Sequence, residues 1–446
     1  MFSTVFCVVL AAGKGARMQS CHPKVLHPVG GLPLLGHCIR TAQLCGIPKI
    51  TAVVSPDLQE VISHFPAHVI DVDTARLSLV VQDPPRGTGE AVQRALHEML
   101  DSTNWALVLY GDTPLVTKEM LQSLLLKAQE RARTGVVLLA MHPQEAAMYA
   151  RLIPTTDGHG IKAVVEAEEA SEHELAHPLC NAGMLLHREV ALHLLPQIMP
   201  RQGREIFLTD IVALAHANGW HCTYTEASAE ALRGANTRAD LAALERTFQE
   251  RARTDAMAHG VTLIDPETVY FSYDTHLEPD VTVLPHVFFD KRVQVGAGSR
   301  IGPFCVLEDV TVGKNAVVGP FARLRPGTTI DDRVHVGNFV EIKNAHIEEG
   351  TKVNHLSYIG DASLGKACNI GAGTITCNYD GREKHKTIIE DGAFIGSNTA
   401  LVAPVRVGKE AIIGAGSTIT RDIPEKALGL TRAPLEIVSE FRKRKK

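Results

Sequence analysis

The sequence predicts two domains of different class, an α/β domain and a parallel β-helix, joined by a helical arm. Three observations in the 446-residue chain predict this fold. Short apolar runs first alternate with amphipathic segments, then one long segment lacks glycine and proline, and the remainder repeats an aliphatic residue every six positions. A chain of this length exceeds what one hydrophobic core usually serves, so two or more domains are expected.

The first domain is predicted at residues 1–233. Its buried strands are expected at Val5 to Leu10, Ile50 to Val54, Ser78 to Val81, Ala106 to Tyr110 and Val136 to Met141, with helical spacing over 34–44, 89–100 and 118–131. Strands that alternate with helices form βαβ units, which predicts a mostly parallel sheet covered on both faces. The arm is predicted at residues 234–260, with a helix from Thr237 to His259 that stops at Gly260.

The second domain is predicted at residues 261–446, and its repeat is clearest from about Val293 to Ile419. Aliphatic residues stand six apart at Val312, Val318, Leu324, Ile330, Val336 and Ile342, and again at Ile395, Leu401, Val407, Ile413 and Ile419. Residues six apart lie on different sides of an α-helix, so this period indicates three short strands per turn of a triangular coil. A longer interruption from Cys377 to Lys386 predicts a loop, of the kind that often lies on a solenoid's binding face.

The composition is that of a soluble globular protein, with 45% apolar and 21% charged residues. The formal net charge of −5 gives no general attraction to nucleic acid, although residues 441–446 form a basic tail. No segment reaches the length of a membrane span. Nine scattered cysteines indicate reduced thiols and a cytoplasmic location, and the 21 histidines lack zinc-type spacing.

Four motifs stand out in the first domain, and the first of them suits a phosphate. A glycine-rich loop, from Leu10 through Gly13 and Gly15 to Arg17, follows the first predicted strand, where backbone N–H groups can approach a phosphate. The loop lacks the third glycine of the dinucleotide fingerprint and the ending of a P-loop. Pro23-Lys24, the pair of Gln82 with Gly87-Thr88-Gly89, and Tyr110-Gly111-Asp112 at a strand end complete the set.

The β-helix carries polar motifs beside its aliphatic columns. They are Arg323-Leu324-Arg325-Pro326-Gly327, Val336 to Lys343, His355 to Asp361, and Asn369 to Gly381. With the motifs of the first domain they resemble the bacterial family of bifunctional N-acetylglucosamine-1-phosphate uridylyltransferases and glucosamine-1-phosphate N-acetyltransferases, over nearly the whole chain. The resemblance implies a Rossmann-like nucleotidyltransferase domain, a left-handed β-helix and a homotrimer.

The resemblance also implies the substrates and the residues that bind them. The substrates would be UTP, N-acetylglucosamine-1-phosphate, glucosamine-1-phosphate and acetyl-CoA, with Mg²⁺ as cofactor. Residues for the UDP-sugar would be Leu10, Ala11, Ala12, Gly13, Lys24, Gln82, Gly87, Thr88, Tyr110, Gly111, Asp112, Ala150, Glu166, Asn181 and Asn236. Asp112 and Asn236 would hold Mg²⁺, which prefers oxygen ligands, and Arg17 and Lys24 would neutralise phosphate charge. Ala150 departs from the family, which has a glycine there.

In the β-helix, acetyl transfer needs a free amine, so a histidine is a suitable general base. His355 is the candidate, with Glu341 to orient and polarise it. By resemblance the amino-sugar phosphate would meet Arg325, Lys343, Tyr358, Asn369 and Lys384. Acetyl-CoA would meet Ala372, Asn378, Tyr379, Ser397, Ala415 and Arg432.

Two other hypotheses are open from the sequence. The first is a monofunctional sugar-nucleotide pyrophosphorylase whose β-helix serves only assembly or regulation. His355, together with Arg325, Lys343 and Lys384, argues against it. The second is a non-enzymatic scaffold or sensor, which the presence of Lys24, Asp112 and Asn236 disfavours.

Overall fold

The computed structural model describes residues 2–64, 72–143, 149–200, 205–439 and 441, so the tail residues 442–446 lie outside the described part. The chain forms two compact units, Met1–Phe248 and Gln249–Lys446. The boundary falls inside helix α7 (Arg238–Ala258), and the predicted limits of the arm, 234 and 260, flank this helix.

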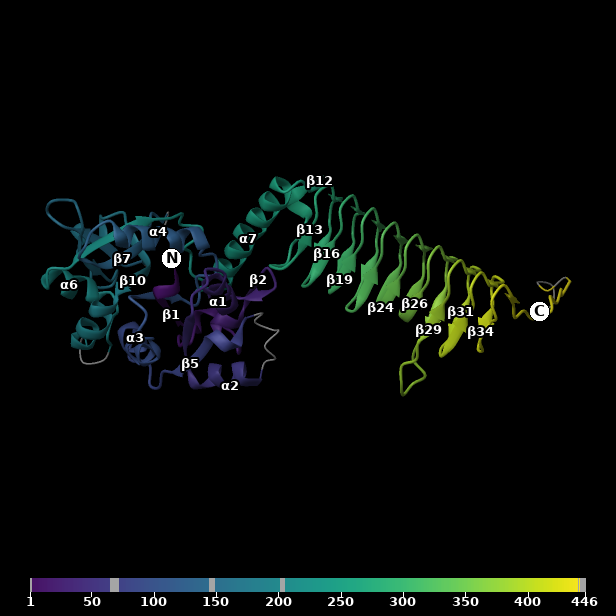
Figure 1. The fold of residues 1–446 in the computed structure, drawn as a ribbon, viewed down its shortest axis with the longest axis horizontal. Coiled ribbons are helices and arrows are strands. Elements are labelled where there is room, and N and C mark those ends of the chain that lie inside the picture. Colours follow the sequence, from purple (N-terminus) through teal and green to yellow (C-terminus); the bar gives the residue numbers. More distant parts are fainter. Residues whose placement is uncertain (1, 65–71, 144–148, 201–204, 440, 442–446) are drawn as a thin grey trace. The chain divides into compact units, whose positions relative to one another are not determined.

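The N-terminal unit is built on a nine-stranded sheet (Figure 1). Its main path runs β11 (His221–Glu226), β7 (Thr134–Met141), β10 (Cys180–His187), β6 (Trp105–Tyr110), β1 (Val5–Leu10), β4 (Lys49–Val54) and β5 (Leu77–Val81). The five predicted strands are confirmed as β1, β4, β5, β6 and β7. The sequence analysis did not predict β11, the antiparallel β10, the hairpin β8 (Arg151–Pro154) and β9 (Ile161–Val165), or the two-stranded β2 (Pro28–Val29) and β3 (Leu32–Pro33). Most of these strands are short and β11 is polar, whereas β10 has eight residues, almost all of them buried.

Helices cover both faces of this sheet, because its strands alternate between two hydrophobic cores. Val5, Cys7 and Val9 face α1 (Leu34–Leu44), α2 (Pro56–His64) and α4 (Lys118–Gln129). Phe6 and Val8 face α3 (Thr88–Ala95) and α6 (Asp210–Ala217). The predicted helices are confirmed, although α3 ends at Ala95 and a 3₁₀ turn continues to Glu98. The helices α2 and α6 and the short α5 (Glu172–Leu175) were not predicted.

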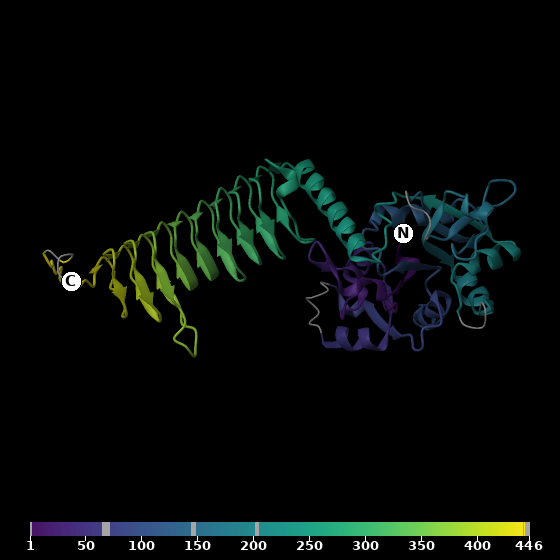
Figure 2. The same cartoon turned by 180° about the vertical axis from the view of Figure 1, so that it is seen from behind.

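The C-terminal unit is a left-handed parallel β-helix, as predicted (Figures 1 and 2). One sheet stacks β12 (Thr262–Leu263), β14 (Thr282–Val283), β17 (Arg300–Ile301), β20 (Val317–Val318), β23 (His335–Asn338), β25 (Lys352–His355), β27 (Asn369–Ile370), β30 (Phe394–Ile395), β33 (Ile412–Ile413) and β35 (Leu428–Gly429).

The remaining strands form two further columns of the coil. The first column is β13 (His276–Leu277), β16 (Val293–Val295), β19 (Val310–Val312), β22 (Thr328–Ile330), the later part of β24 (Glu341–Ile347), the later part of β26 (Tyr358–Leu364), β29 (Thr387–Ile389) and β32 (Val405–Val407). The second is β15 (Phe288–Phe289), β18 (Val306–Leu307), β21 (Arg323–Leu324), the beginnings of β24 and β26, β28 (Ile375–Cys377), β31 (Ala400–Val402) and β34 (Thr418–Ile419).

The predicted aliphatic columns are buried in the centre of the coil, with Leu324, Val336 and Ile342 fully covered. The coil begins earlier than the predicted Val293, because β12 already pairs with β14. The six-residue spacing is present in this early part too, at Leu277, Val283, Phe289, Val295, Ile301 and Leu307. The predicted interruption is a loop that protrudes from the coil, closed by an antiparallel bridge between Tyr379 and Lys384 (Figure 1).

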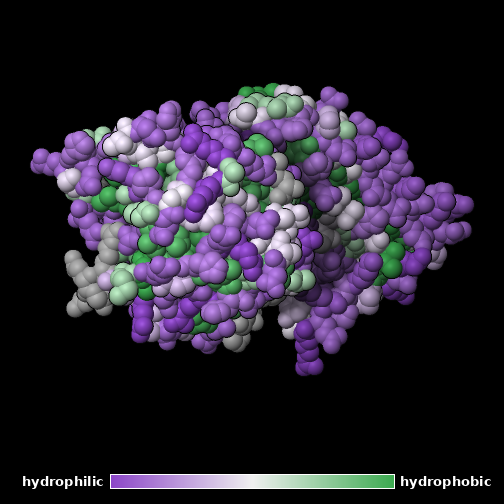
Figure 3. Space-filling model, turned by 60° about the vertical axis from the view of Figure 1, so that its left-hand side comes forward, coloured by the Kyte–Doolittle hydropathy of each residue, from purple (hydrophilic) through white to green (hydrophobic). Residues whose placement is uncertain are grey.

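The surface facing the viewer in Figure 3 is mostly hydrophilic, with hydrophobic residues in small, separate patches. Among the described residues, no helix combines the length and the apolar character that crossing a bilayer requires.

Candidate active sites

The first candidate site lies where β1 and β6 end side by side. Leu10 pairs with Tyr110, and the Gly111 N–H donates to the Leu10 carbonyl at 2.9 Å. The glycine-rich loop follows, with Ala11 buried and Ala12 and Gly13 increasingly exposed. Gly15 has a left-handed φ of +63°, and a side chain there would come within 2.5 Å of Lys24 Cβ. This glycine therefore lets the Lys24 stem pack against the loop.

Four predicted residues from distant parts of the sequence form one polar cluster. The Lys24 ammonium forms a short ion pair with Asp112 and lies 3.3 Å from Asn236 Oδ1. Arg17 donates to the same Asn236 oxygen at 3.1 Å. The Ala235 N–H donates to the Asp112 carbonyl, which holds the segment of Asn236 against the end of β6. The cluster thus brings two cations and two oxygen ligands together.

The chemistry of Asp112 and Asn236 fits a magnesium ion. A carboxylate and an amide carbonyl are hard oxygen ligands, and both already converge on one cation, the Lys24 ammonium. Lys24 and Arg17 would remain beside the ion to neutralise phosphate charge. The donor set therefore suits an ion that keeps waters and phosphate oxygens in its remaining positions.

The residues predicted for the sugar form a second group. Asn181 Nδ2 donates to the Tyr110 hydroxyl at 3.3 Å, and the Thr209 hydroxyl donates to Glu166 at 2.7 Å. Burial and the nearby Glu166 carboxylate raise the pKa of Tyr110, so this hydroxyl remains neutral. The Asn181 N–H donates to the Ala150 carbonyl. The backbone at Ala150 thus stays tied to this group although the residue is not glycine.

Gln82 comes directly after β5 and is almost fully buried. Its side-chain amide nitrogen donates to the Gly87 carbonyl at 2.9 Å and to Glu90 Oε2 at 2.5 Å. Thr88 begins α3, and its hydroxyl accepts a hydrogen bond from the Leu208 N–H. The three residues predicted for the base therefore lie together at the start of this helix.

The second candidate site lies on the open surface of the β-helix. His355 Nδ1 lies 2.9 Å from Asn338 Oδ1, one coil away. An oxygen acceptor at this nitrogen places the ring proton on Nδ1 and leaves Nε2 with a free lone pair. Glu341, predicted to orient His355, accepts instead from Arg325 at 2.7 Å. In this structure the residue that orients His355 is Asn338.

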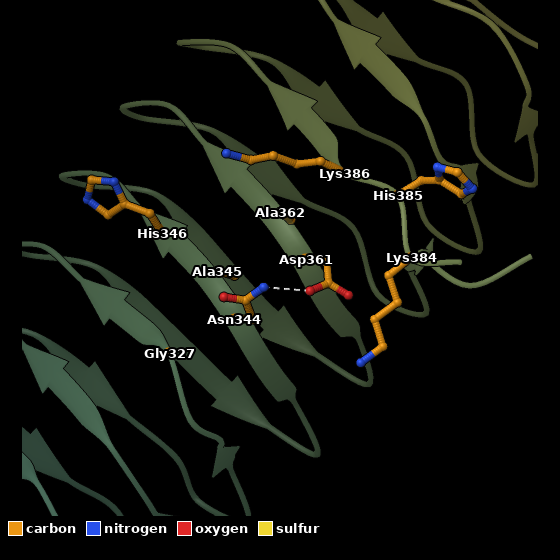
Figure 4. A pocket seen from close by; sticks show the side chains of 9 residues that line it. All are labelled: Gly327, Asn344, Ala345, His346, Asp361, Ala362, Lys384, His385 and Lys386. Carbon is orange, nitrogen blue, oxygen red and sulfur yellow. Dashed lines mark hydrogen bonds between the residues drawn. The ribbon is translucent and has the colours of Figure 1, made fainter. Parts of the chain in front are cut away.

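Positive charge collects around Lys343, in β24. The nearby Lys384 ammonium lowers the pKa of Lys343, Arg325 contributes in the same direction, and Asp361 opposes them. Like charges held this close favour an anion between them. A cavity of about 400 Å³ adjoins them (Figure 4). It is lined by Gly327, Asn344, Ala345, His346, Asp361, Ala362, Lys384, His385 and Lys386.

The protruding loop that carries Lys384 is fixed by one carboxylate. Asp380 accepts from the backbone N–H groups of Glu383 and Arg382 and lies 2.7 Å from the His385 ring. These partners lower the pKa of Asp380 to about 2, so it stays charged. The loop therefore has a defined shape beside the cavity.

Tyr358 and Asn378 meet at the base of the loop. Asn378 Nδ2 donates to Asp361 in a short contact and lies 3.5 Å from the Tyr358 hydroxyl. Asn344 also donates to Asp361, as Figure 4 shows. Asn369 lies apart from this group, in β27 of the other sheet.

Of the residues predicted for acetyl-CoA, Ala372, Ser397 and Ala415 stack along one corner of the coil, whereas Asn378 and Tyr379 follow β28 at another corner. The Asn398 N–H donates to the Ala372 carbonyl, and the Gly416 N–H donates to the Ser397 carbonyl. Ala415 lies against Gly396, and Arg432 lies 3.3 Å from where a side chain on Gly414 would begin. Tyr379 is exposed at the foot of the protruding loop. Ala372, Ser397 and Ala415 thus form a strip along the coil, and Asn378 and Tyr379 lie at the base of the protruding loop.

Sequence reasoning missed Asn338, Asp361 and Glu90. The first two could have been found from the length of one coil, because Asn338 precedes His355 by 17 residues and Asp361 precedes Asn378 by 17. Glu90 follows Gln82 by eight residues, across a turn whose shape the spacing does not show.

Comparisons with known proteins agree with both halves. Residues 7–194 match the model of the MobA-like NTP transferase domain, and residues 309–344 and 386–421 match that of the bacterial transferase hexapeptide. The chain is similar to the bifunctional protein GlmU of Paramagnetospirillum magneticum, 43% identical over 96% of this chain and 94% of that one. It is also similar to those of Zymomonas mobilis, 43% over 98% of each, and Paracoccus denitrificans, 44% over 96% and 94%.

Proposed function

Because this chain belongs to the family of bifunctional GlmU proteins, we propose that its two units use the clusters described above for the two steps that make UDP-N-acetylglucosamine. The chain is a uridylyltransferase and an acetyltransferase. The single observation that carries the residue assignment is that each unit gathers cations at one cluster, Lys24 with Arg17 and Lys343 with Lys384.

In the acetyl-transfer step, the phosphate of glucosamine-1-phosphate would bind Arg325, Lys343 and Lys384. His355 Nε2 would take a proton from the sugar amine as the amine attacks the thioester carbonyl of acetyl-CoA. The C–S bond then breaks and the CoA thiolate leaves. Asn338 would hold the ring with Nε2 toward the amine. The role of Glu341 would be to hold Arg325 in place.

In the uridylyl step, a phosphate oxygen of N-acetylglucosamine-1-phosphate attacks the α-phosphorus of UTP, and pyrophosphate leaves. Lys24 and Arg17 would neutralise the charge that both polyanions bring together. Asp112 and Asn236 would hold Mg²⁺, which when bound supplies further charge neutralisation on the phosphates. Tyr110, Asn181 and Glu166 would hold the sugar, and Gln82, Gly87 and Thr88 the uracil.

We further propose a homotrimer assembled through the β-helix. Its support is a stack at one corner of the coil, where His286, Phe304, Phe321 and Phe339 follow one another with ring centroids 4.9 to 5.1 Å apart. The three phenylalanines are 45–54% exposed, and Leu356, beside His355, is 61% exposed at a similar corner turn. An apolar strip of this length is typical of a subunit interface. A cytoplasmic location is supported by the nine free cysteines.

One coupled assay tests the function. The full chain, with Mg²⁺, UTP and N-acetylglucosamine-1-phosphate, should release pyrophosphate without acetyl-CoA. With glucosamine-1-phosphate instead, pyrophosphate release should require acetyl-CoA and free CoA thiol should appear. If glucosamine-1-phosphate gave neither product while the acetylated sugar reacted, the acetyl-transfer assignment would be wrong.

A further inference from the structure

The hydrogen-bond partners of the buried Gln82 side chain fix the orientation of its amide group. Its nitrogen donates to the Gly87 carbonyl at 2.9 Å and to Glu90 Oε2 at 2.5 Å. Both partners are acceptors without a proton, so the opposite orientation would place the Gln82 oxygen against two oxygens. Both amide hydrogens are therefore used inside the protein, and Gln82 can offer a ligand only its oxygen, Oε1.

Glu90 is itself held in place as a charged acceptor. Its other oxygen, Oε1, pairs with the Arg94 guanidinium one helical turn later, in a short contact, and the Glu90 side chain is only 12% exposed. Arg94 also donates to the carbonyls of Val81 and Asp83, the two neighbours of Gln82 in the sequence. Glu90 thus holds the Gln82 amide while Arg94 holds both Glu90 and the backbone on either side of Gln82. We call the pair of Glu90 and Arg94 the clamp. A glutamate in the first turn of α3 also suits the positive end of that helix.

We infer that Glu90 is a specificity-determining positioning residue of the uridylyl site, which makes Gln82 an acceptor for the N3–H group of uracil. This inference rests on the proposed function, in which Gln82 faces the base. Uracil carries a hydrogen on N3, whereas cytosine carries a lone pair there, which would face the Gln82 oxygen unfavourably. A freely rotating amide could turn its NH₂ group to cytosine, and Glu90 prevents that rotation. The discrimination between UTP and CTP therefore depends on a residue that touches neither nucleotide.

The same geometry limits what Glu90 can do. Thymine carries N3–H as uracil does, so the clamp does not separate UTP from dTTP. The acetyl-transfer cluster belongs to the other unit. These two reactions provide internal controls in one purified protein.

The test compares Glu90→Met, which removes the acceptor but keeps a similar length, with Glu90→Gln, which keeps an oxygen acceptor. The kcat/KM for UTP, CTP and dTTP is measured by pyrophosphate release from the full-length chain with Mg²⁺ and N-acetylglucosamine-1-phosphate. Glu90→Met should lower the UTP-to-CTP ratio by about tenfold, because one of two interactions that fix the amide is lost. Glu90→Gln should stay within about twofold of the wild type, and the UTP-to-dTTP ratio should not change in either variant.

Coupling between the two residues separates this role from a purely structural one. In a Gln82→Ala background, Glu90→Met should cause no further change in the UTP-to-CTP ratio, because no amide remains to orient. Arg94→Met, which releases the other end of the clamp, should change the ratio in the same direction by less, and it serves if Glu90→Met fails to fold. Acetyl transfer measured on each preparation reports that the chain is folded.

The outcomes are distinct. A wild-type protein that releases no pyrophosphate from UTP contradicts the proposed uridylyl function itself. A wild-type protein that prefers UTP, with Glu90→Met and Arg94→Met both lowering UTP and CTP turnover equally, overturns the inference about Glu90 and leaves the proposed function standing.

Discussion

The two candidate sites of this protein are assembled in opposite ways. In the N-terminal unit, contacts join residues far apart in sequence, with separations of 88, 212 and 219 residues among Arg17, Lys24, Asp112 and Asn236. In the β-helix, the partners lie 16 to 20 residues apart, one coil from each other. In a parallel sheet, residues at the ends of several strands lie close together at one edge, where a crevice can form. In a β-helix, polar residues on successive turns lie in a row on an open surface. We therefore propose that the first site is largely formed within one chain and that the second is completed from outside the coil.

The largest expected effect would separate the two sites completely. His355→Ala should lower acetyl transfer about a thousandfold, because the amine loses its general base, and should leave uridylyl transfer unchanged. Release of CoA thiol and of pyrophosphate, measured on the same preparation, gives both rates. His276→Ala, at an exposed histidine of the first coils, is the matched control. Equal loss of both activities would show that the two sites are not independent.

The reciprocal change is expected to be somewhat smaller. Lys24→Met should reduce uridylyl transfer about a hundredfold, since one of the two cations near Asp112 is removed while Arg17 remains. Acetyl transfer should not change. The control is Lys118→Met, an exposed lysine at the start of α4. A Lys24→Met enzyme with normal pyrophosphate release would contradict the placement of the phosphates at this cluster.

Whether the acetyl-transfer site needs a neighbouring subunit can be tested at the stack of His286, Phe304, Phe321 and Phe339. Phe321→Ser removes the middle ring of the stack and should weaken subunit association by about thirtyfold, the usual cost of truncating an aromatic residue at the centre of an interface. Light scattering across a dilution series should show the loss of the trimer, and acetyl transfer should fall with it. Uridylyl transfer should persist. Phe394→Ser, an exposed phenylalanine outside this stack, is the control. Undiminished acetyl transfer by a dissociated chain would show that the coil site is complete by itself.

The same contrast explains how far the sequence could predict the structure. Most of the coil could be predicted from the six-residue spacing, because every turn repeats the same pattern of aliphatic residues. Leu324 and Val336, for example, must face inward. The early coils through Leu277 and Phe289 lie inside the predicted second domain, although the repeat was expected only from about Val293. In the N-terminal unit, the five long apolar strands were predictable, but the partners of Gln82 and Tyr110 were not. Glu90 and Asn181 reach them through turns and an antiparallel strand, and no local pattern encodes those contacts.

The smallest expected effect distinguishes the stability of the two units in acid. His37 is buried, its Nε2 lies 2.8 Å from the Val29 carbonyl, and burial lowers its pKa from 6.5 to about 4. In the unfolded chain the His37 imidazole is therefore protonated near pH 6.5, whereas in the folded N-terminal unit it is protonated only near pH 4. Stability from this residue is present above pH 6.5, declines as the pH falls, and stops declining below pH 4.

Between pH 7 and pH 5.5, His37 should lower the free energy of unfolding of the N-terminal unit by about 1 kcal/mol. His37→Gln, which keeps an N–H donor and cannot titrate, should reduce the pH dependence of the calorimetric transition of the N-terminal unit by that amount and leave the transition of the β-helix unaltered. His276→Gln should change neither. If His37→Gln kept the wild-type pH slope, the acid sensitivity of the N-terminal unit would have to arise from groups other than this buried imidazole.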